Sequence, residues 1–508
     1  MPREEDFQNE VAPPIISPIK MMDVRQPAMA LDSRNCSDAR NVEVDKGVVR
    51  KRTGYAAFSI AINGGGNLTG RIQGLSQSPF GWTDDIVTLQ QDGINTKYYL
   101  YSTSGNNWVF AAGETPQTDY SQLSDCPSVL SSGTEVVILS DNKARLQVWD
   151  DSQASAVDKI IALGTTAELR AQVVRSIRDH LVLFNVGEKN GSWVQANRKV
   201  QWMDTGDPTA DTGGVSGSNS LLGRRGGMIV GAEMLGHNCA IYCEKQIVMM
   251  VYTGGSTAAT LFRFDDVVHD VGLAGQNAIA DLGNRHLFLA NDLSVQEFSG
   301  GSSLRPIGDA INADIWDNIN KTHYGNSFFQ VIKGLKEARL FIPTSGATPD
   351  LVYVFKYGDT IQPEVWYKHS LTGFCGISYD TFYGLVGGTA LINNFDISAA
   401  NDGTTAIDAY WDSIDFVLPD PSMRYRSMQL NFMAKGSQVD TYYSTDEGTT
   451  WTTIKAGQAL TGAYTYYSHK FDLKTARMVR FRFRDDDVSR DFYIRWFQPI
   501  LYPTGSRD

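Results

Sequence analysis

The chain has 508 residues, of which 42% are hydrophobic and 20% charged, a balance typical of a folded globular protein rather than a disordered one. No apolar run is long enough to span a membrane as a helix. The formal charge of −12 and the scattered basic residues argue against tight nucleic-acid binding, which depends on neutralising phosphates. At roughly 150 residues per domain, the length allows for about three domains.

Glycine and aromatic residues are abundant, with 47 Gly, 22 Tyr, 23 Phe and 10 Trp against 17 Pro. Many turns joining short strands, with aromatic side chains between sheets, would give such a composition, so we predict an all-β fold. The five Cys are widely spaced and odd in number, which predicts buried reduced thiols. The polar start Met1–Asp6 has no apolar stretch behind it, so we expect no Sec-type signal peptide.

The first 50 residues are interrupted by prolines. Pro13, Pro14, Pro18 and Pro27 fall in a stretch with little periodicity. Because proline lacks the N–H that a strand ladder needs, we predict an extended N-terminal arm over residues 1–50 that lies on a neighbouring molecule.

Residues 51–395 contain short β-type runs separated by Gly, Asn, Asp and Ser, in groups of three or four. In the first group, runs at 71–75, 85–89, 97–101 and 108–110 are joined by turns. Groups of four strands are typical of propeller blades, so we predict a β-propeller with about six or seven blades. Later groups are expected at 136–163, 173–207, 226–265, 276–307, 324–368 and 372–392.

One short helix is predicted within this region. Ile311, Ile315 and Ile319 are four residues apart and would lie on one helix face. Residues 166–174 are a weaker candidate for a second helix.

After residue 395 the strands become longer and alternate apolar with polar residues. This period of two is clear in Met428–Met433, Val439–Tyr443, Met478–Phe483 and Phe492–Phe497. It predicts a separate C-terminal β-sandwich over residues 396–508.

His237, Cys239 and Cys243 resemble half of a zinc site, because zinc prefers these ligands. The segment is strand-like and no second Cys/His pair lies nearby, so core packing is the favoured interpretation. Gly64–Gly66 and Gly223–Gly227 lack the Lys-Ser/Thr end of a phosphate-binding loop. The other histidines are isolated and are expected to make structural hydrogen bonds: His180, His269, His286, His323, His369 and His469.

Two acidic runs carry carboxylates that a hard cation such as calcium could use. They are Asp485–Asp487 with Asp491, and Asp265–Asp266 with Asp270. Solvated turns are the favoured interpretation of both. A glycosidase would need two carboxylates across a cleft, which a sequence does not reveal. We therefore predict no catalytic, cofactor-binding or metal-binding residue, no cofactor and no enzymatic activity.

Residues 444–451 read Ser-Thr-Asp-Glu-Gly-Thr-Thr-Trp and match the Asp-box pattern S-x-D-x-G-x-T-W. Asp446 is expected to accept from turn N–H groups, Gly448 to supply an unusual φ, and Trp451 to pack underneath. The segment resembles the Asp boxes of sialidases, which recur in each propeller blade. Here one copy lies outside the predicted propeller, without the family's Arg signature, so it indicates a fold detail and not an activity.

Three segments resemble propeller-bearing structural proteins of tailed bacteriophages. Asn35–Tyr55 is similar to that family's opening "N-v-x-v-d-x-G-x-x-r-k-R-x-G", and Lys199–Pro208 to its "v-x-W-s-x-x-G-d-P" strand and turn. Ser294–Gly300 with Pro306–Gly308 is similar to its "g-v-y-x-f-x-G" and "x-p-I-G" pair, although Ser294 and Gln296 depart from the pattern. The resemblance implies a non-enzymatic virion protein of the phage tail, assembled in the host cytoplasm.

The order of arm, propeller and small β-domain is similar to the tail nozzle, or hub, of short-tailed, podovirus-like phages. This resemblance implies a hexameric ring below the adaptor, through whose lumen genomic DNA leaves. The implied partners are further copies of the chain, an adaptor or portal-side protein, and tail fibres or spikes, with DNA passing without tight binding and no membrane insertion. An acidic lumen would repel a duplex that carries about one charge per 1.7 Å, and the arm could lock neighbours by adding a strand.

Two alternatives stay open. The Asp box and the ten Trp residues are compatible with a tail-associated propeller that binds or hydrolyses glycans. The protein could instead occupy another virion position, as a head-closure or baseplate-side scaffold.

Overall fold

The structure of the protein is a computed structural model, and it describes residues 15–504 except 18, 21, 24, 78–83, 93–94, 103–106, 115–121, 132, 144, 151–167, 222–225, 359–364, 379–383, 396–398 and 418–423. The chain divides into two compact units. Unit 1 comprises Met1–Ala56, Tyr353–Ser370 and Asp396–Asp508, and unit 2 comprises Ala57–Val352 and Leu371–Phe395. Both are built almost entirely from antiparallel strands.

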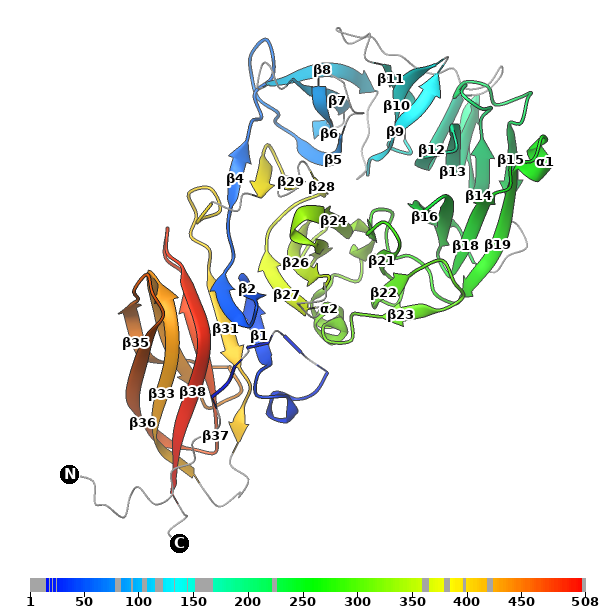
Figure 1. The fold of residues 1–508 in the computed structure, drawn as a ribbon. Helices are drawn as coiled ribbons and strands as arrows, with labels where there is room; N and C mark the ends of the chain where they lie inside the picture. Colours follow the sequence, from blue (N-terminus) through cyan, green and yellow to red (C-terminus); the bar gives the residue numbers. More distant parts are fainter. Residues whose placement is uncertain are drawn as a thin grey trace. The chain divides into compact units, whose positions relative to one another are not determined.

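Unit 2 is a β-propeller. Its sheets follow one another along the chain, and the first strand of each lies beside the first strand of the next, from β5 through β9, β12, β16, β20, β24 and β28 back to β5. Figure 1 shows these sheets arranged around a circle. The first sheet consists of β5 (Arg71–Gln77), β6 (Asp84–Asp92), β7 (Asn95–Ser102) and β8 (Asn107–Glu114), and the second of β9 (Ser124–Ser131), β10 (Thr134–Ser140) and β11 (Gln147–Asp150). The third consists of β12 (Glu168–Ile177), β13 (His180–Asn190), β14 (Ser192–Trp202) and β15 (Gly217–Ser220), and the fourth of β16 (Ile229–Leu235), β17 (Asn238–Cys243), β18 (Gln246–Tyr252) and β19 (Phe262–His269). The fifth consists of β20 (Ile279–Asp281), β21 (His286–Leu289), β22 (Val295–Phe298) and β23 (Leu304–Pro306).

The circle closes with strands from distant parts of the sequence. The last sheet has the order β28-β29-β30-β4, so its outer strand precedes the first sheet along the chain. Recruiting an early strand into the last sheet holds the circle shut, because separating the ends then requires breaking a strand ladder. The strands of the last two sheets are β24 (Phe328–Ile332), β25 (Glu337–Pro343), β26 (Pro349–Lys356) and β27 (Val365–Ser370), then β28 (Cys375–Ser378), β29 (Gly384–Gly387), β30 (Ile392–Phe395) and β4 (Tyr55–Phe58). Of these, β27 falls in the Tyr353–Ser370 segment of unit 1.

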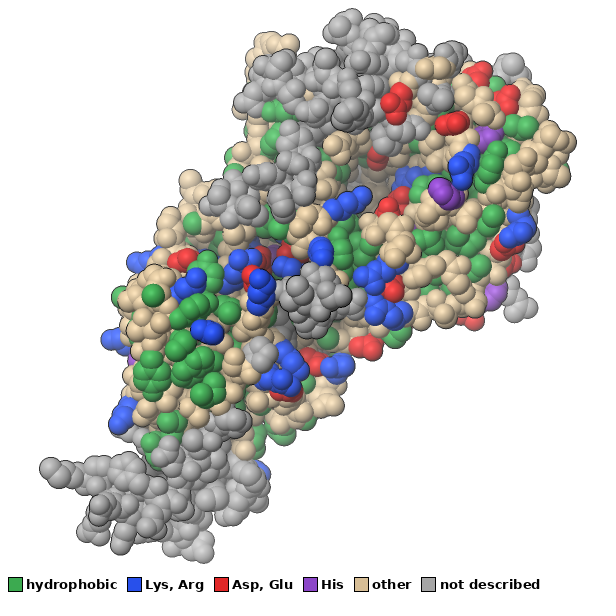
Figure 2. All heavy atoms as spheres, viewed as in Figure 1, with side chains coloured by type: hydrophobic (Ala, Val, Ile, Leu, Met, Phe, Trp, Pro, Cys, Tyr) green, Lys and Arg blue, Asp and Glu red, His purple; other side chains and the backbone are tan. Residues whose placement is uncertain are grey.

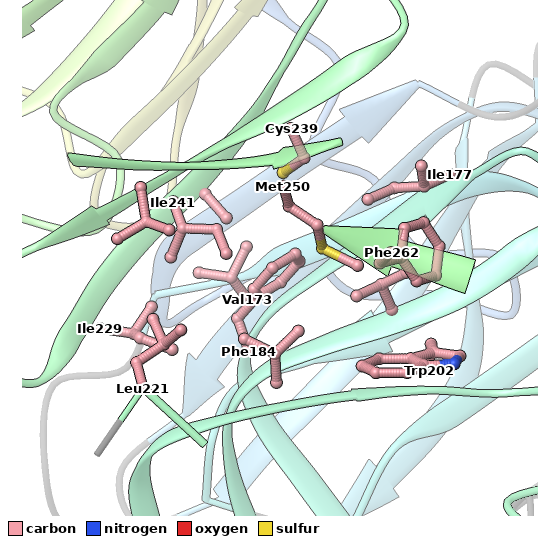
Figure 3. Close-up of a cluster of buried hydrophobic side chains, with 14 of the residues drawn as sticks. Val173, Ile177, Phe184, Trp202, Leu221, Ile229, Cys239, Ile241, Met250 and Phe262 are labelled. Atoms are coloured by element: carbon pink, nitrogen blue, oxygen red, sulfur yellow. The ribbon is translucent and has the colours of Figure 1, made fainter. Parts of the chain in front are cut away.

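Hydrophobic side chains fill the space between neighbouring sheets of the propeller. Figure 3 shows one such cluster, in which Val173 and Phe184 of one sheet meet Ile241 and Met250 of the next. All four are fully buried or nearly so. Burying a side chain of this size stabilises the fold by about 1.5–3 kcal/mol. Side chains on the facing surfaces of neighbouring sheets thus supply the core of the propeller.

The short helix of the propeller lies where the isoleucine spacing predicted it. Helix α2 spans Asn312–Asn318, and Ile311, Ile315 and Ile319 are all buried. The expectation of a further helix over 166–174 is wrong from Glu168 onward, because Glu168–Ile177 forms strand β12 with Leu169, Ala171 and Val173 buried in alternation. The expected strand at 160–163 lies outside the described residues. Among the described residues, the other helices are single turns: α1 (Ala258–Leu261) and the 3₁₀ helices η2 (Ala28–Ala30), η3 (Tyr324–Asn326) and η4 (Lys333–Leu335).

Unit 1 contains a β-sandwich of two sheets. Between them, the ring of Phe483 lies 5.3 Å from Phe432 and 5.8 Å from Phe497, and Trp411 lies 5.3 Å from Phe497. One sheet has the order β1-β31-β37-β34-β35, with β32 added to β37, and the other has the order β2-β3-β38-β33-β36. The strands are β1 (Cys36–Arg40), β2 (Val42–Asp45), β3 (Val48–Lys51), β31 (Ala409–Ser413), β32 (Phe416–Val417), β33 (Arg424–Gly436), β34 (Gln438–Ser444), β35 (Thr452–Ala459), β36 (Thr465–Ala476), β37 (Met478–Asp485) and β38 (Phe492–Thr504).

The expected extended arm over residues 1–50, lying on a neighbouring molecule, is wrong from Ile16 onward. Ile16, Ile19 and Met22 are buried, and the Ile16 N–H donates to the Phe497 carbonyl of the same chain at 2.9 Å. Strands β1, β2 and β3 belong to the sandwich, with Cys36, Ala39, Val42 and Val49 buried. Each strand has only four or five residues, and β1 and β3 pair with β31 and β38, hundreds of residues away, so the local pattern carried little signal. The sandwich therefore needs both ends of the sequence, and not residues 396–508 alone.

Candidate functional site

The cysteines suggested as zinc ligands lie in the propeller core. Cys239 and Cys243 belong to the cluster of Figure 3, and burial raises the pKa of the Cys239 thiol well above its usual range. His237 is exposed at the turn between β16 and β17. Within the described ranges, no three His, Cys, Asp or Glu side chains lie close enough to share a metal ion.

Several histidines make hydrogen bonds inside the fold. The Nδ1 atom of His180 lies 2.9 Å from the Met203 carbonyl oxygen. The ring of His286 lies between the Tyr242 hydroxyl, at 2.9 Å, and the Met234 carbonyl oxygen, at 2.8 Å. These contacts fix the rings within the packing between sheets and leave them buried.

The expected solvated turn over Asp485–Asp487 is wrong for Asp485, which ends β37 and is buried, whereas Asp486 and Asp487 are exposed in the connection to β38. Asp265 and Asp266 likewise lie within strand β19 and not in a turn. Several of these carboxylates contact cations. The Lys51 Nζ lies 2.7 Å from Asp485 Oδ2, and Arg484 pairs with Asp486 at 2.9 Å. Arg490 pairs with Asp487. In the propeller, Arg263 similarly pairs with Asp265 at 2.8 Å. Internal ion pairs thus occupy carboxylates that could otherwise have served a cation.

Of the two glycine-rich segments, the structure describes the first in full. Gly64, Gly65 and Gly66 all have φ near +90° to +110° and form the tip of a turn between β4 and β5. Residues 222–225, which include Gly223, lie outside the described residues.

The Asp box forms the predicted stapled turn. Asp446 Oδ1 accepts from the Thr450 N–H at 2.8 Å and from the Ser444 hydroxyl at 2.7 Å, while Oδ2 accepts from the Thr450 hydroxyl at 2.6 Å. Gly448 has φ +88°. These hydrogen bonds, first among them that from the Thr450 hydroxyl, lower the pKa of Asp446 to about 2. Both carboxylate oxygens of Asp446 therefore accept hydrogen bonds from within the turn.

Trp451 contributes to a stack around Arg482. The Arg482 guanidinium lies 4.0 Å from the Trp451 ring centroid and 4.1 Å from that of Tyr410. It also donates to both carboxylate oxygens of Asp412, at 2.6 and 2.7 Å. A planar guanidinium suits stacking and a two-point ion pair at once. The Asp box thus anchors a tryptophan that covers a structural arginine.

The opening segment that resembles the phage family is built around Arg52. Its side chain is 1% exposed and donates to Asn41 Oδ1 at 2.9 Å and to the two oxygens of Asp402 at 2.9 and 2.6 Å. It also donates to the carbonyl oxygens of Thr53 and Ser370, at 2.9 and 3.2 Å. A buried arginine is tolerated when its N–H groups are satisfied in this way.

Two neighbours of Arg52 in the same segment are equally constrained. Asn41 has φ +55°, a conformation that asparagine accepts more readily than most residues, and its amide donates to the Asp408 carbonyl at 2.8 Å. A Cβ on Gly54 would lie 1.9 Å from the Asn401 carbonyl oxygen. Asn41, Arg52 and Gly54 therefore serve the fold of unit 1.

A group of aromatic and basic side chains lies on the outer side of the β2-β3-β38-β33-β36 sheet of unit 1. In β33, Leu430, Phe432 and Ala434 point into the sandwich and are buried, while Met433 and Lys435 alternate with them and point outward. We call this surface the aromatic face, and it consists of Met433, Lys435, Tyr464, Tyr466, Tyr493, Arg495 and Trp496. Figure 2 shows hydrophobic side chains with basic ones among them on this part of the sandwich, where Figure 1 draws β33 and β38.

Backbone register and ring contacts hold the aromatic face together. Met433 pairs with Trp496 on one side and with Tyr466 on the other, and the Tyr466 and Trp496 rings are 6.0 Å apart. The side chain of Tyr466 is 52% exposed. A preassembled set of rings costs little conformational entropy when a partner binds.

Two basic side chains lie over tyrosine rings of this face. Lys435 Nζ is 4.8 Å from the Tyr493 centroid and 5.1 Å from that of Tyr464, and Arg495 is 5.6 Å from Tyr464. Among the described side chains, neither Lys435 nor Arg495 lies within ion-pair distance of a carboxylate. The sequence predicted the strands that carry these residues but not their meeting, because they come from three strands separated along the chain.

The geometry defines an all-β protein with a propeller unit and a sandwich unit. No family model matches the chain, and no curated protein matches it. Solved structures similar to it include BamB from Moraxella catarrhalis (7% identity, 63% of this chain and 95% of that one, TM-score 0.32). Others are Sqt1 from Saccharomyces cerevisiae (9%, 70% and 99%, 0.36) and the C-terminal WD40 domain of Sif2 (9%, 68% and 98%, 0.35). The propeller assignment rests on the closed circle of sheets, and these distant likenesses carry no functional argument.

Proposed function

We propose that this chain is a non-enzymatic structural protein of a tailed-phage virion, acting as the tail nozzle or hub below the adaptor. The observation that supports this proposal best is the network of hydrogen bonds around Arg52. The residues of Asn35–Tyr55 on which the phage resemblance depends, including Asn41, Arg52 and Gly54, are those that the sandwich needs for its packing. The resemblance therefore concerns residues with a structural role.

The other two similar segments also serve the fold. Trp202 is buried against Phe262, with ring centroids 5.3 Å apart, and its indole N–H donates to the Val215 carbonyl at 2.9 Å. At the third segment, the Gly308 carbonyl accepts from the N–H groups of Ile311 and Asn312 at the start of α2. A family defined by such positions would share an architecture.

The proposed partners follow from this position. Further copies of the chain would form a ring, an adaptor or portal-side protein would lie on one side, and tail fibres or spikes would attach to it. A net charge of −12 suits a conduit for DNA, because a duplex is repelled by an acidic surface and would pass without sticking.

In the described part of the chain, no helix has the length and apolar character needed to cross a membrane.

The test is quantitative mass spectrometry of purified particles of the virus that encodes the chain, together with the native mass of the isolated protein. We expect about six copies per particle and a discrete oligomer whose size matches. Absence from purified particles would contradict the proposal. A particle copy number far from six would favour a head-closure or baseplate-side position instead.

Truncating all of residues 1–50 is not a suitable test of assembly. The deletion would remove β1, β2 and β3 from the sandwich and would disturb folding. A deletion of residues 1–14 leaves every described strand intact and tests whether the start of the chain locks neighbouring subunits together.

The glycan alternative remains testable. Its main motif, the Asp box, lies in the sandwich, and Asp446 is fully used in hydrogen bonds. Hydrolysis or specific retention of host surface glycans by the full-length protein would support that alternative, whereas inactivity on a broad panel would count against it.

A further inference from the structure

We propose that the aromatic face is a self-association surface, and that its occupant is an acidic surface of a second copy of this chain. The inference rests on the proposed ring-forming function and names one surface by which copies meet. Three observations support it: the composition of the aromatic face, its charge, and the contacts that already hold its rings together in the isolated chain.

The composition of the face matches the centre of a protein interface. Tyrosine, tryptophan, methionine and arginine are enriched at such centres, and tryptophan, tyrosine and arginine dominate binding energy there. Tyr466, Trp496 and Met433 lie in register across three strands on the outer side of the sheet. A solvent-facing sheet surface usually carries polar residues at these positions.

The charge of the face complements the rest of the molecule. Lys435 and Arg495 present two positive charges, while the whole chain carries a net charge of −12. Beside the face, Arg50 lies opposite Tyr493 in register and pairs with Glu43 at 2.8 Å. Another copy of so acidic a chain offers carboxylates that can pair with Lys435 and Arg495 as the rings are covered.

The geometry suits a macromolecular surface. The rings of Tyr466 and Trp496 are tilted by 44° and lie side by side. Lys435 lies over the rings of Tyr464 and Tyr493, and Arg495 lies over that of Tyr464. The aliphatic stems of Lys435 and Arg495 extend the apolar surface around the rings, as basic side chains commonly do. The result is a broad patch with two fixed charges.

The experiment is sedimentation velocity of the full-length protein over a wide concentration range, at low and high salt. Three proteins are compared with wild type: Tyr466→Ala with Trp496→Ala, Lys435→Glu with Arg495→Glu, and a matched control, Val194→Ser with Lys333→Glu. The control also removes an exposed apolar side chain and reverses a charge, but on the propeller. Circular dichroism and thermal unfolding verify that each variant is folded.

We expect wild type to associate more weakly at high salt, because exposed charges are screened. Removing the two rings should weaken association by at least about 30-fold, the usual effect of truncating a hot-spot residue. Reversing the two charges should weaken association and reverse its salt dependence, because high salt would then screen repulsion between the new glutamates and the carboxylates of the partner copy. The control should behave as wild type.

Three results would overturn the inference. If association is unchanged in both face variants, copies meet elsewhere, and the proposed ring survives while the aromatic face is excluded. If wild type is monomeric at every concentration, the self-association surface and the ring formed by the isolated protein both fail. If the face variants associate normally but lose binding to oligogalacturonate, used as an anionic saccharide probe, the face binds glycans instead.

Discussion

The side-chain ammonium of Lys51, near the start of the sequence, lies 2.7 Å from a carboxylate oxygen of Asp485, near its end. Both side chains are at most 2% exposed, and Lys51 also donates to the Asp487 carbonyl at 3.1 Å. Burial raises the pKa of Asp485, and Lys51 opposes this rise. The pair therefore ties an early strand into the sandwich at a position where neither charge reaches water.

Replacing Lys51 with methionine should lower the free energy of unfolding of the sandwich by about 3–5 kcal/mol, because the Asp485 carboxylate would be buried without its cation. Chemical denaturation monitored by tryptophan fluorescence measures the loss. The deficit should shrink as pH falls, since a proton can then neutralise Asp485. Adding Asp485→Leu should recover most of the stability, and a double variant as unstable as Lys51→Met would contradict this explanation.

Gly54→Ala should destabilise unit 1 by about 1–3 kcal/mol or more, because the new Cβ would lie 1.9 Å from the Asn401 carbonyl oxygen and the backbone must shift. Gly462→Ala is the matched control in the same unit, since no atom lies within 4 Å of the position that its new Cβ would take. Thermal unfolding of both variants provides the comparison. Equal melting temperatures for the two would show that the contact at Gly54 relaxes freely.

Asp446→Asn should remove a pH-dependent part of the sandwich's stability. The folded-state pKa of Asp446, about 2, lies below its ordinary value of 3.8 because the Thr450 and Ser444 hydrogen bonds favour the carboxylate. Its contribution is therefore fully present above about pH 4 and is lost as pH falls toward 2. The melting temperatures of wild type and variant should differ at pH 7 and converge near pH 2. A constant difference across this range would argue against the carboxylate as the source.

Gln330→Leu should destabilise the propeller by about 1–3 kcal/mol. The Gln330 side chain is buried and donates to the Ile377 and Leu385 carbonyls, at 2.9 and 3.0 Å, and so joins β24 to the neighbouring sheet. Leucine has a similar volume but leaves both carbonyls without this donor. Differential scanning calorimetry should show a lower propeller transition, with Ser302→Ala on an exposed turn as the control. An unchanged transition would mean that water replaces the amide at no cost.

The sequence by itself predicted most strands of the propeller and the helix around Ile315. Each depends on a local pattern, either a period of two or a spacing of four, that is visible within a few residues. The Asp box was equally local, because Ser444, Asp446 and Thr450 bond to one another across one turn.

Only the tertiary structure decided which strands complete each sheet. β1, β2 and β3 join a sandwich formed mostly by residues beyond 408, and β4 completes a propeller sheet whose other strands begin at residue 375. The aromatic face likewise needs Met433, Tyr466 and Trp496 to meet in register. A four-residue strand carries too little pattern to name a partner hundreds of residues away, so the choice is made by the burial and hydrogen bonding of the assembled sheet.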